Sequence, residues 1–468
     1  MISRRQVARL IDQAEEGYLH CWSFLERLKA GTLGSLLIQE IFNFQPRLAG
    51  SIFSLDQLYR EIEAEKKRWI QKKESLSVDW FRRRMKTLDY YREAVREALA
   101  IGKDIGDTLA WFFYQNENDL LRRHLEQPEV RHTPPGIGGF GELEFVKKMP
   151  IFDRKLVIYH GITSFLRIGD ISLVDMETLR VSSVAELKTR QADAENLSIT
   201  IVCYRPGNES ASPSQAMEVT QRDQNLALLD PTAKARLVRQ MRKMEDAFTG
   251  YSVDANFDFD GITHHDSLRQ LIGKMSRRNM AWEKAGDGLL LIGIRKNRSK
   301  GLSVMLLSRS RAYTANRRLP PGSIAARIHN EASTENALLL SHLKFGFDPG
   351  YIPAFWLDLD LDFVKDVMFR RLRVFSAYNP AFLFKKLRAN GFTVIWDSDQ
   401  APRIEYHGAV FKASLDSLVG PVKSIQQHLL REETVIKILL DPLQGIESGE
   451  LPRFESMSLF FDERLSLG

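Results

Sequence analysis

The chain has 468 residues, 44% of them hydrophobic and 10% aromatic, a composition that excludes a largely disordered protein. Its length exceeds that of one typical folding core, so it predicts two or three domains. The formal net charge of +6 and the pI of about 9.1 permit a polyanionic partner but do not require one.

The cysteine content and the spread of apolar residues bear on the cellular compartment. The sequence holds Cys21 and Cys203 and no CxxC pair, so it has no disulfide framework. Glu15 and Glu16 interrupt the apolar residues near the start, and no uninterrupted run of about 18 apolar residues occurs. We therefore expect a cytoplasmic protein that does not enter the membrane.

Residues 1–130 are predicted to form a helical N-terminal domain. Between about residues 54 and 113, apolar residues recur at helical spacing with charged residues between them. Ordinary helix packing explains this pattern, and so does contact with a partner subunit or a second copy of the chain. Pro128, Pro134 and Pro135 then interrupt helix formation.

Residues 131–340 are predicted to form a second domain of α/β character. Its strand-like segments are short apolar runs, at 155–163, 170–175, 181–189, 197–204, 288–294 and 303–308. Helical patterns cover residues 139–150 and 233–248. The glycines of GIGGFG at 136–141 follow prolines rather than an apolar strand, so they indicate a loop and not a dinucleotide site.

Residues 341–468 are predicted to form a C-terminal α/β region whose role the sequence does not reveal. The run FWLDLDLDF alternates strictly, which predicts a strand with Asp358, Asp360 and Asp362 on one face. A water-facing strand side explains these acids more simply than a cation site does. Helical signals follow at 382–390 and 417–430.

Two strand-like runs carry the residues that indicate chemistry. Glu186 and Lys188 are two apart in VAELKT, so on a strand they point to the same face. Asp170 opens the preceding run, and a turn at 176–180 joins the two runs as a hairpin. This connection brings Asp170 close to Glu186 and Lys188. The alternative is an edge strand on which Glu186 and Lys188 form a surface ion pair without function.

Phosphodiester hydrolysis explains why these residue types occur together. The reaction needs a nucleophilic water and stabilisation of negative charge, and a hard cation such as Mg²⁺ or Mn²⁺ supplies both. Asp170 and Glu186 would bind the cation, with the main-chain carbonyl of Leu187 as a further ligand. Lys188 would orient the attacking water or stabilise its developing charge.

This pattern resembles the PD-(D/E)xK nuclease superfamily. Asp170 stands where the family has its first acid, and Glu186 and Lys188 stand as its ExK; the proline of the motif name is absent. The resemblance implies a restriction-endonuclease-like fold, with a mixed central sheet flanked by helices, whose core runs helix, three strands, helix, strand. It also implies a metal-dependent nuclease, DNA favoured, in prokaryotic DNA processing or defence against phage.

Family members often add a carboxylate from the helix before the strands. Glu142 lies three, four and seven residues before Phe145, Val146 and Met149, which predicts an inward-facing carboxylate. Glu144 aligns instead with lysines, which predicts a solvated ion-pair face. The resemblance also implies an auxiliary polar residue on the following helix, for which Gln240 is the candidate.

A basic segment follows the second domain's apolar strands. It contains no acidic residue from 295 to 330, and its predicted nucleic-acid-binding residues are Arg295, Lys296, Arg298, Lys300, Arg309, Arg311, Arg317 and Arg318. A solvated cationic loop is the alternative. Two other functions remain open for the whole chain: a nucleic-acid-binding or scaffold subunit without catalysis, and an effector that cleaves RNA.

Overall fold

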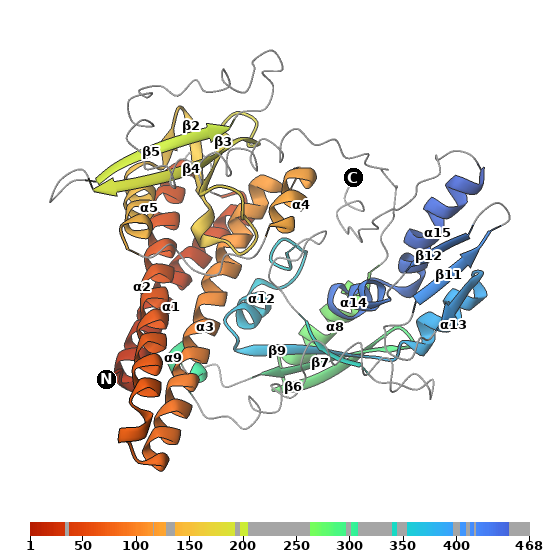
Figure 1. The fold of residues 1–468 in the computed structure, drawn as a ribbon. Helices are drawn as coiled ribbons and strands as arrows, with labels where there is room; N and C mark the ends of the chain where they lie inside the picture. The colour runs from red at the N-terminus through yellow and green to blue at the C-terminus, as the bar shows by residue number, and fades with distance from the viewer. Residues whose placement is uncertain are drawn as a thin grey trace. The chain divides into compact units, whose positions relative to one another are not determined.

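The computed structural model describes residues 1–32, 37–115, 117–127, 136–191, 197–204, 263–295, 301–307, 339–343, 353–395, 403–408, 412–415 and 418–448. These residues form two compact units (Figure 1). Unit 1 comprises residues up to 253 together with 300–308, and unit 2 comprises 254–299 and the chain from 309 onward.

Unit 1 begins with a bundle of long helices, in agreement with the predicted helical N-terminal region. Helices α1, α2 and α3 run side by side (Figure 1). Ser3 and Ser77 cap α1 and α3 by accepting from the N–H groups of Gln6 and Trp80. The helices of this region are α1 (Arg4–Lys29), α2 (Leu37–Gln71), α3 (Val78–Tyr114) and α4 (Asn118–Glu126), with a 3₁₀ turn η2 (Lys73–Ser75).

A five-stranded sheet completes unit 1, and helix α5 (Ile137–Lys148) packs against it. Its order is β1-β2-β3-β4-β5. Gln45 of α2 bonds the free edge of β2 beyond β1, since its amide contacts the Val157 carbonyl and the Tyr159 N–H. The sheet elements are β1 (Ile151–Phe152), β2 (Lys155–Tyr159), η3 (His160–Ile162), β3 (Ile171–Asp175), β4 (Val181–Gln191) and β5 (Leu197–Tyr204).

The prediction of α/β structure is confirmed, but the expected mixed pairing within this sheet is not found. Every pairing among the described strands of the sheet is antiparallel. The reason lies in the connection from β4 to β5, which spans only residues 192–196. A parallel neighbour would need a crossover of about a dozen residues or more. The helix expected at 233–248 lies outside the described residues.

Helix α9 (Leu302–Leu306) also belongs to unit 1, and it corrects the strand predicted at 303–308. Its first N–H groups bond acids of α1: Leu302 donates to Glu15 and Ser303 to Asp12. Tyr90 of α3 donates to the carbonyl of Leu306. The apolar run forms a helical turn because distant carboxylates satisfy its N-terminus.

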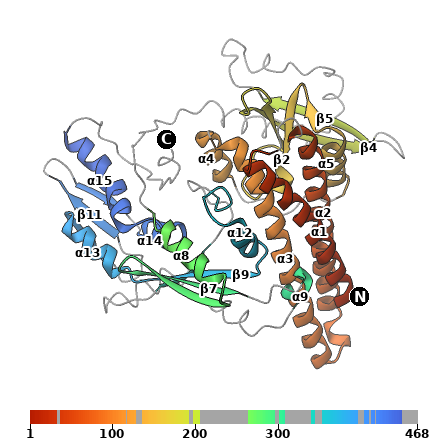
Figure 2. The same cartoon turned by 180° about the vertical axis from the view of Figure 1, so that it is seen from behind.

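Unit 2 contains two antiparallel sheets. The larger sheet has the order β6-β7-β9-β8, and the smaller has β10-β11-β12. Figures 1 and 2 show α8, α12 and α14 on one side of the larger sheet, in agreement with the contacts of these helices with its strands. The strands are β6 (Met280–Ala285), β7 (Leu289–Arg295), β8 (Leu339–His342), β9 (Leu372–Tyr378), β10 (Phe392–Ile395), β11 (Arg403–His407) and β12 (Lys412–Leu415).

The helices of unit 2 include the two that the sequence predicts near 382–390 and 417–430. They are α8 (His265–Met275), α12 (Leu361–Met368), α13 (Ala381–Ala389), α14 (Val419–His428) and α15 (Glu432–Ser448). The C-terminal region is therefore α/β, as expected.

The strand predicted over FWLDLDLDF is wrong, because a turn and the start of α12 occupy these residues. Asp360 is the N-cap of α12 and accepts from the Phe363 N–H at 2.7 Å. Asp362 lies in the first helical turn, and Asp358 is fully exposed. Capping by Asp360 outweighs the alternation that favoured a strand.

The division into units differs from the predicted boundaries near residues 130 and 340. The helices of residues 1–130 pack with the five-stranded sheet in one unit, and unit 2 begins at residue 254. Among the described helices, none is long and apolar enough to cross a membrane.

Candidate active site

The site is built where β3 begins beside β4. Gly169 has a φ of +70°, and a Cβ there would lie 2.7 Å from the carbonyl oxygen of Ala185, so only glycine fits. The next residue, Asp170, donates its N–H to that Ala185 carbonyl at 2.8 Å. Its Oδ2 accepts from the N–H of Leu187 at 2.7 Å. Asp170 thus forms hydrogen bonds with β4 just before β3 begins.

The carbonyl of Leu187 points to the same side as Asp170. In an antiparallel ladder, the N–H and C=O of one residue face one neighbour, and those of the next residue face the other. The N–H of Leu187 meets the Asp170 carboxylate, so its carbonyl is directed toward the β3 side as well. The ladder thus directs the Leu187 carbonyl toward the side on which the Asp170 carboxylate lies.

Glu186 and Lys188 lie on one face of β4, as their spacing predicts. The Lys188 Nζ lies 2.5 Å from Glu186 Oε1, and the side chain of Glu186 is 8% exposed whereas that of Lys188 is 28% exposed. The alternative of an edge strand is wrong, because β4 pairs with β3 on one side and β5 on the other. The ion pair is buried at its acidic end and open to solvent at its basic end.

Helix α5 brings Glu142 to the same region. Glu142 is buried, and its Oε2 accepts from the Tyr159 hydroxyl at 2.7 Å. The helix approaches β4 closely, since a Cβ at Gly141 would overlap the Thr189 side chain. Glu144 instead pairs with Lys147 at 2.8 Å, as the spacing along the helix predicts.

The three acids influence one another electrostatically. Burial raises the pKa of Asp170 well above its usual range, and the charges of Glu186 and Glu142 raise it further, against the hydrogen bond from Leu187. The pKa of Glu142 is raised mainly by burial and also by Glu186, while the Tyr159 hydroxyl and Lys188 lower it. These two carboxyl groups thus resist ionisation mainly because they are withdrawn from water, and secondly because each faces the charge of other acids.

Among the described residues, no group of three or more His, Cys, Asp or Glu side chains lies close enough together to hold a metal ion. The acids at this site are separately anchored, by Leu187, Lys188 and Tyr159. The site thus consists of separately held carboxyl groups beside one lysine.

A buried hydrogen-bond chain supports the loop that carries Asp170. His124 Nδ1 accepts from the N–H groups of Arg167 and Ile168, which leaves its Nε2 as the donor toward the Tyr114 hydroxyl at 3.4 Å. The hydroxyls of Tyr114 and Ser172 lie 2.5 Å apart, and Ser172 lies 2.5 Å from His160 Nε2.

The chain ends at the residue before Asp170. His160 Nδ1 donates to the carbonyl of Gly169 at 3.1 Å, so Nε2 is the acceptor for Ser172. Burial lowers the pKa of His160 to about 3 and that of His124 well below its usual range, so both imidazoles are neutral. No local pattern in the sequence points to this chain, because its members come from α3, α4, η3 and β3.

The remaining predicted residues do not join this site. Arg295 ends β7 in unit 2, where its side chain is 8% exposed and lies 3.5 Å from Asp366. A buried, ion-paired guanidinium is not accessible to a phosphate, so Arg295 is not a nucleic-acid-binding residue of the kind predicted. The others lie outside the described residues, namely Gln240, Lys296, Arg298, Lys300, Arg309, Arg311, Arg317 and Arg318.

Comparison with family models, with curated proteins and with solved structures finds no match to this chain.

Proposed function

We propose that this protein is a divalent-metal-dependent nuclease whose active site comprises Asp170, Glu186, Lys188 and Glu142. One observation carries the proposal: Asp170 just before β3, Glu186 of β4 and Glu142 of α5 interact beside a lysine that reaches solvent. An ordinary surface ion pair has no reason to lie beside two further acids that are largely withdrawn from water.

The donor set fits Mg²⁺ or Mn²⁺. Three acids and one lysine share a mostly buried site, where burial first and the charges of neighbouring acids second raise the pKa values of Asp170 and Glu142. A bound cation would offset the repulsion among these acids. Hard oxygen donors suit these cations. Separately held carboxylates also suit them, because Mg²⁺ usually keeps several waters and binds one or two carboxylates plus phosphate oxygens rather than an all-protein cage.

Each side chain then has a chemical task. Asp170, Glu186 and the Leu187 carbonyl would hold the ion, which supplies charge stabilisation and activation of water when bound. The Lys188 ammonium, held by Glu186, can orient the attacking water and stabilise negative charge that develops on the phosphate. Glu142 acts beside them as a third acid, oriented by Tyr159.

The order of elements supports a relation to the restriction-endonuclease-like core. A helix with an acid, α5, precedes the antiparallel strands β2 to β4; Asp170 lies just before β3, and β4 carries Glu186 and Lys188. Strand β5 follows β4 where such a core has a helix, and this order departs from the expected one.

DNA is the favoured substrate, by the resemblance of the motif, and the test compares it directly with RNA. Purified protein would be incubated with plasmid, linear duplex, single-stranded DNA and RNA, each with Mg²⁺ or with EDTA. We expect cleavage in Mg²⁺ alone, and we expect Lys188→Ala to reduce the rate by about 100-fold or more while nucleic-acid binding persists.

Lys147→Ala is the matched control, because Lys147 is a lysine of α5 that pairs with Glu144 and is 44% exposed. It should cleave as the wild type does. Normal cleavage by Lys188→Ala would overturn the mechanism. Binding without cleavage by the wild type would favour a scaffold or binding subunit, and cleavage confined to RNA would favour an RNA-directed effector.

A further inference from the structure

The larger sheet of unit 2 has one face covered by helices and one face that carries exposed apolar side chains. Helices α8 and α14 cover the first face, on which Leu291 and Val374 are fully buried (Figure 2). On the other face, Met280 is 60% exposed, Trp282 is 61% exposed and Leu340 is 50% exposed. Large apolar residues exposed together on one face indicate a binding surface.

An aromatic row crosses this open face. Trp282 of β6 is in register with Ile292 of β7, Ile292 with Phe375 of β9, and Phe375 with His342 of β8. The rings of Phe375 and His342 lie 5.1 Å apart at an interplanar angle of 84°. Since side chains in register share a face, one row across four strands presents three rings.

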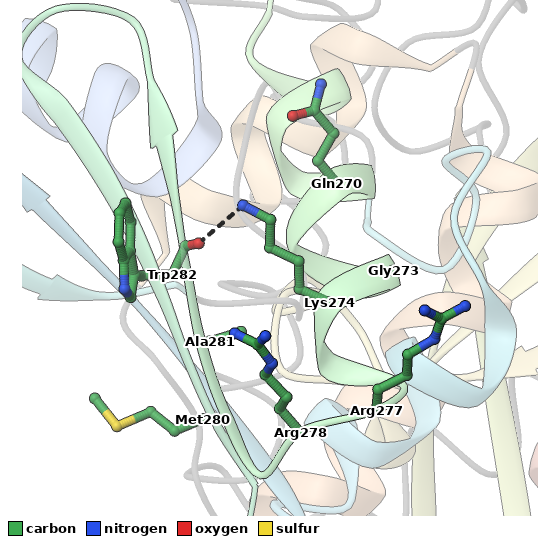
Figure 3. A pocket seen from close by; sticks show the side chains of 8 residues that line it. All are labelled: Gln270, Gly273, Lys274, Arg277, Arg278, Met280, Ala281 and Trp282. Carbon is green, nitrogen blue, oxygen red and sulfur yellow. Dashed lines mark hydrogen bonds between the residues drawn. The ribbon is translucent and has the colours of Figure 1, made fainter.

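A cationic pocket adjoins the exposed end of this row. The pocket has a volume of about 640 Å³ and lies between the C-terminal half of α8 and strand β6. Figure 3 shows Lys274, Arg277 and Arg278 around it, together with Trp282 and Met280. Lys274 reaches over the edge of β6, since its Nζ lies 3.5 Å from the Trp282 carbonyl and 5.8 Å from the Trp282 ring centre.

The charge of the pocket is positive. Lys274 is balanced by Glu283 at 2.5 Å. Arg277 and Arg278 are exposed, and within the described part of the chain neither guanidinium forms an ion pair. Two arginines therefore face solvent beside an exposed indole. Such groups bind phosphates and stack on planar bases.

We infer that unit 2 binds single-stranded nucleic acid, with phosphates at Arg277 and Arg278 and bases against Trp282 and the row that continues to Phe375. Charge complementarity favours a polyanion over an apolar protein partner. The exposed indole of Trp282 favours a single strand over a duplex, because paired bases are stacked inside a duplex and cannot reach it. This inference rests on the proposed function, because it assigns to unit 2 the binding of the nuclease's polynucleotide substrate.

Binding of fluorescent oligonucleotides to the full-length chain tests the inference, in EDTA so that cleavage does not interfere. The probes are a single-stranded DNA of 20 nucleotides, an RNA of the same sequence and the matching DNA duplex. We expect tighter binding of the single strands than of the duplex. Trp282→Ala should weaken single-strand binding about tenfold. The double variant Arg277→Ala with Arg278→Ala should weaken it and reduce its salt dependence, by a slope of about 0.7 for each lost contact.

Arg269→Ala is the matched control, since Arg269 is an exposed arginine of α8 that pairs with Asp266. It should bind as the wild type does. Circular dichroism verifies that each variant is folded. Equal binding of single strand and duplex, equal binding of poly-glutamate, or unchanged binding by the Trp282 and arginine variants would overturn the inference. A wild type that binds single strands but cleaves nothing would overturn the nuclease proposal alone.

Discussion

Both units contain three neighbouring acids, which are neighbours in space in unit 1 and in sequence in unit 2. Glu142 lies on a helix, Glu186 on a strand and Asp170 just before a strand; burial first, and then the charges of neighbouring acids, raise the pKa values of Asp170 and Glu142. In unit 2, Asp358, Asp360 and Asp362 are close in sequence, yet one is fully exposed, one caps a helix and one lies in its first turn.

This difference distinguishes acids that are gathered by the fold from acids that are merely close in sequence. Exposed acids are screened by water and have structural uses such as capping. Acids that converge where water is largely excluded resist ionisation, and proteins retain such costly groups mostly where a cation or a reaction needs them.

The largest effect is expected for Asp170→Asn. Asparagine can still accept from the Leu187 N–H, but it removes a charged metal ligand, so cleavage should fall by about 1000-fold. The same change relieves repulsion among the acids, so without divalent ions the free energy of unfolding should rise by about 0.5–2 kcal/mol. Nuclease assays and urea denaturation measure the two effects.

Asp175→Asn serves as the control for that substitution, because Asp175 lies at the opposite end of β3 from Asp170 and caps a turn at Thr178. It should change neither activity nor stability appreciably. An Asp170→Asn protein that is active, or that is less stable than the wild type, would remove Asp170 from the set of interacting acids.

A smaller effect is expected for Glu142→Gln, compared with Glu144→Gln two residues further along α5. Glu142 is buried beside the other acids, whereas Glu144 pairs with exposed lysines. Cleavage should fall about 10–100-fold for Glu142→Gln and stay unchanged for Glu144→Gln. Equal activities of the two variants would show that the third acid has no part in the reaction.

The pH dependence of stability sharpens the comparison further. A carboxyl group whose folded pKa is raised destabilises the fold above that pKa, and the penalty vanishes as pH falls below about 4. The stability gain of Asp170→Asn should therefore grow as the pH rises above about 4 and disappear in acid. Urea denaturation of both proteins from pH 8 to pH 4 checks this; a gain that persists unchanged at pH 4 would mean that charge is not its cause.

Both proteins share a second acid-dependent effect. His160, with a pKa lowered to about 3, and His124 stay neutral when folded but gain protons when unfolded below about pH 6.5. Stability should thus fall with acid in both, and the difference between the two proteins isolates the carboxyl group.

The smallest effect is expected in the acidic run of unit 2. Asp360→Ala removes the cap of α12 and should cost about 1 kcal/mol of stability, while Asp358→Ala should cost nothing measurable. Neither should change cleavage. Thermal unfolding of the two variants side by side measures this, and loss of activity in either would reopen the run as a functional site.

Local pattern predicted much of the site's scaffold but not its surroundings. The spacing of Glu186 and Lys188, the hairpin to Asp170 and the inward face of Glu142 follow from strand and helix periods, which depend only on neighbouring residues. The strand predicted at 303–308 is a helix because Glu15 and Asp12, almost 300 positions away, bond its start. Sequence periodicity carries no information about such contacts.

The support behind the site could not be predicted for the same reason. The hydroxyl of Ser172 is buried within β3, and its hydrogen-bond partners, Tyr114 and His160, come from other elements. The open face of the larger sheet in unit 2 is not predicted either. The alternation in β6 and β7 indicates strands, but it does not indicate which face of the sheet the helices leave uncovered.

The position of α9 limits how this protein can be divided. Because the polypeptide returns to unit 1 at residues 300–308, a truncation after residue 253 would remove α9. It would also remove the hydrogen bond that the Leu302 N–H donates to Glu15. Such a fragment would expose the apolar surface against which Leu302 and Met305 are buried. Recombinant production of unit 1 by itself would thus need α9 restored, as a fused segment or an added peptide.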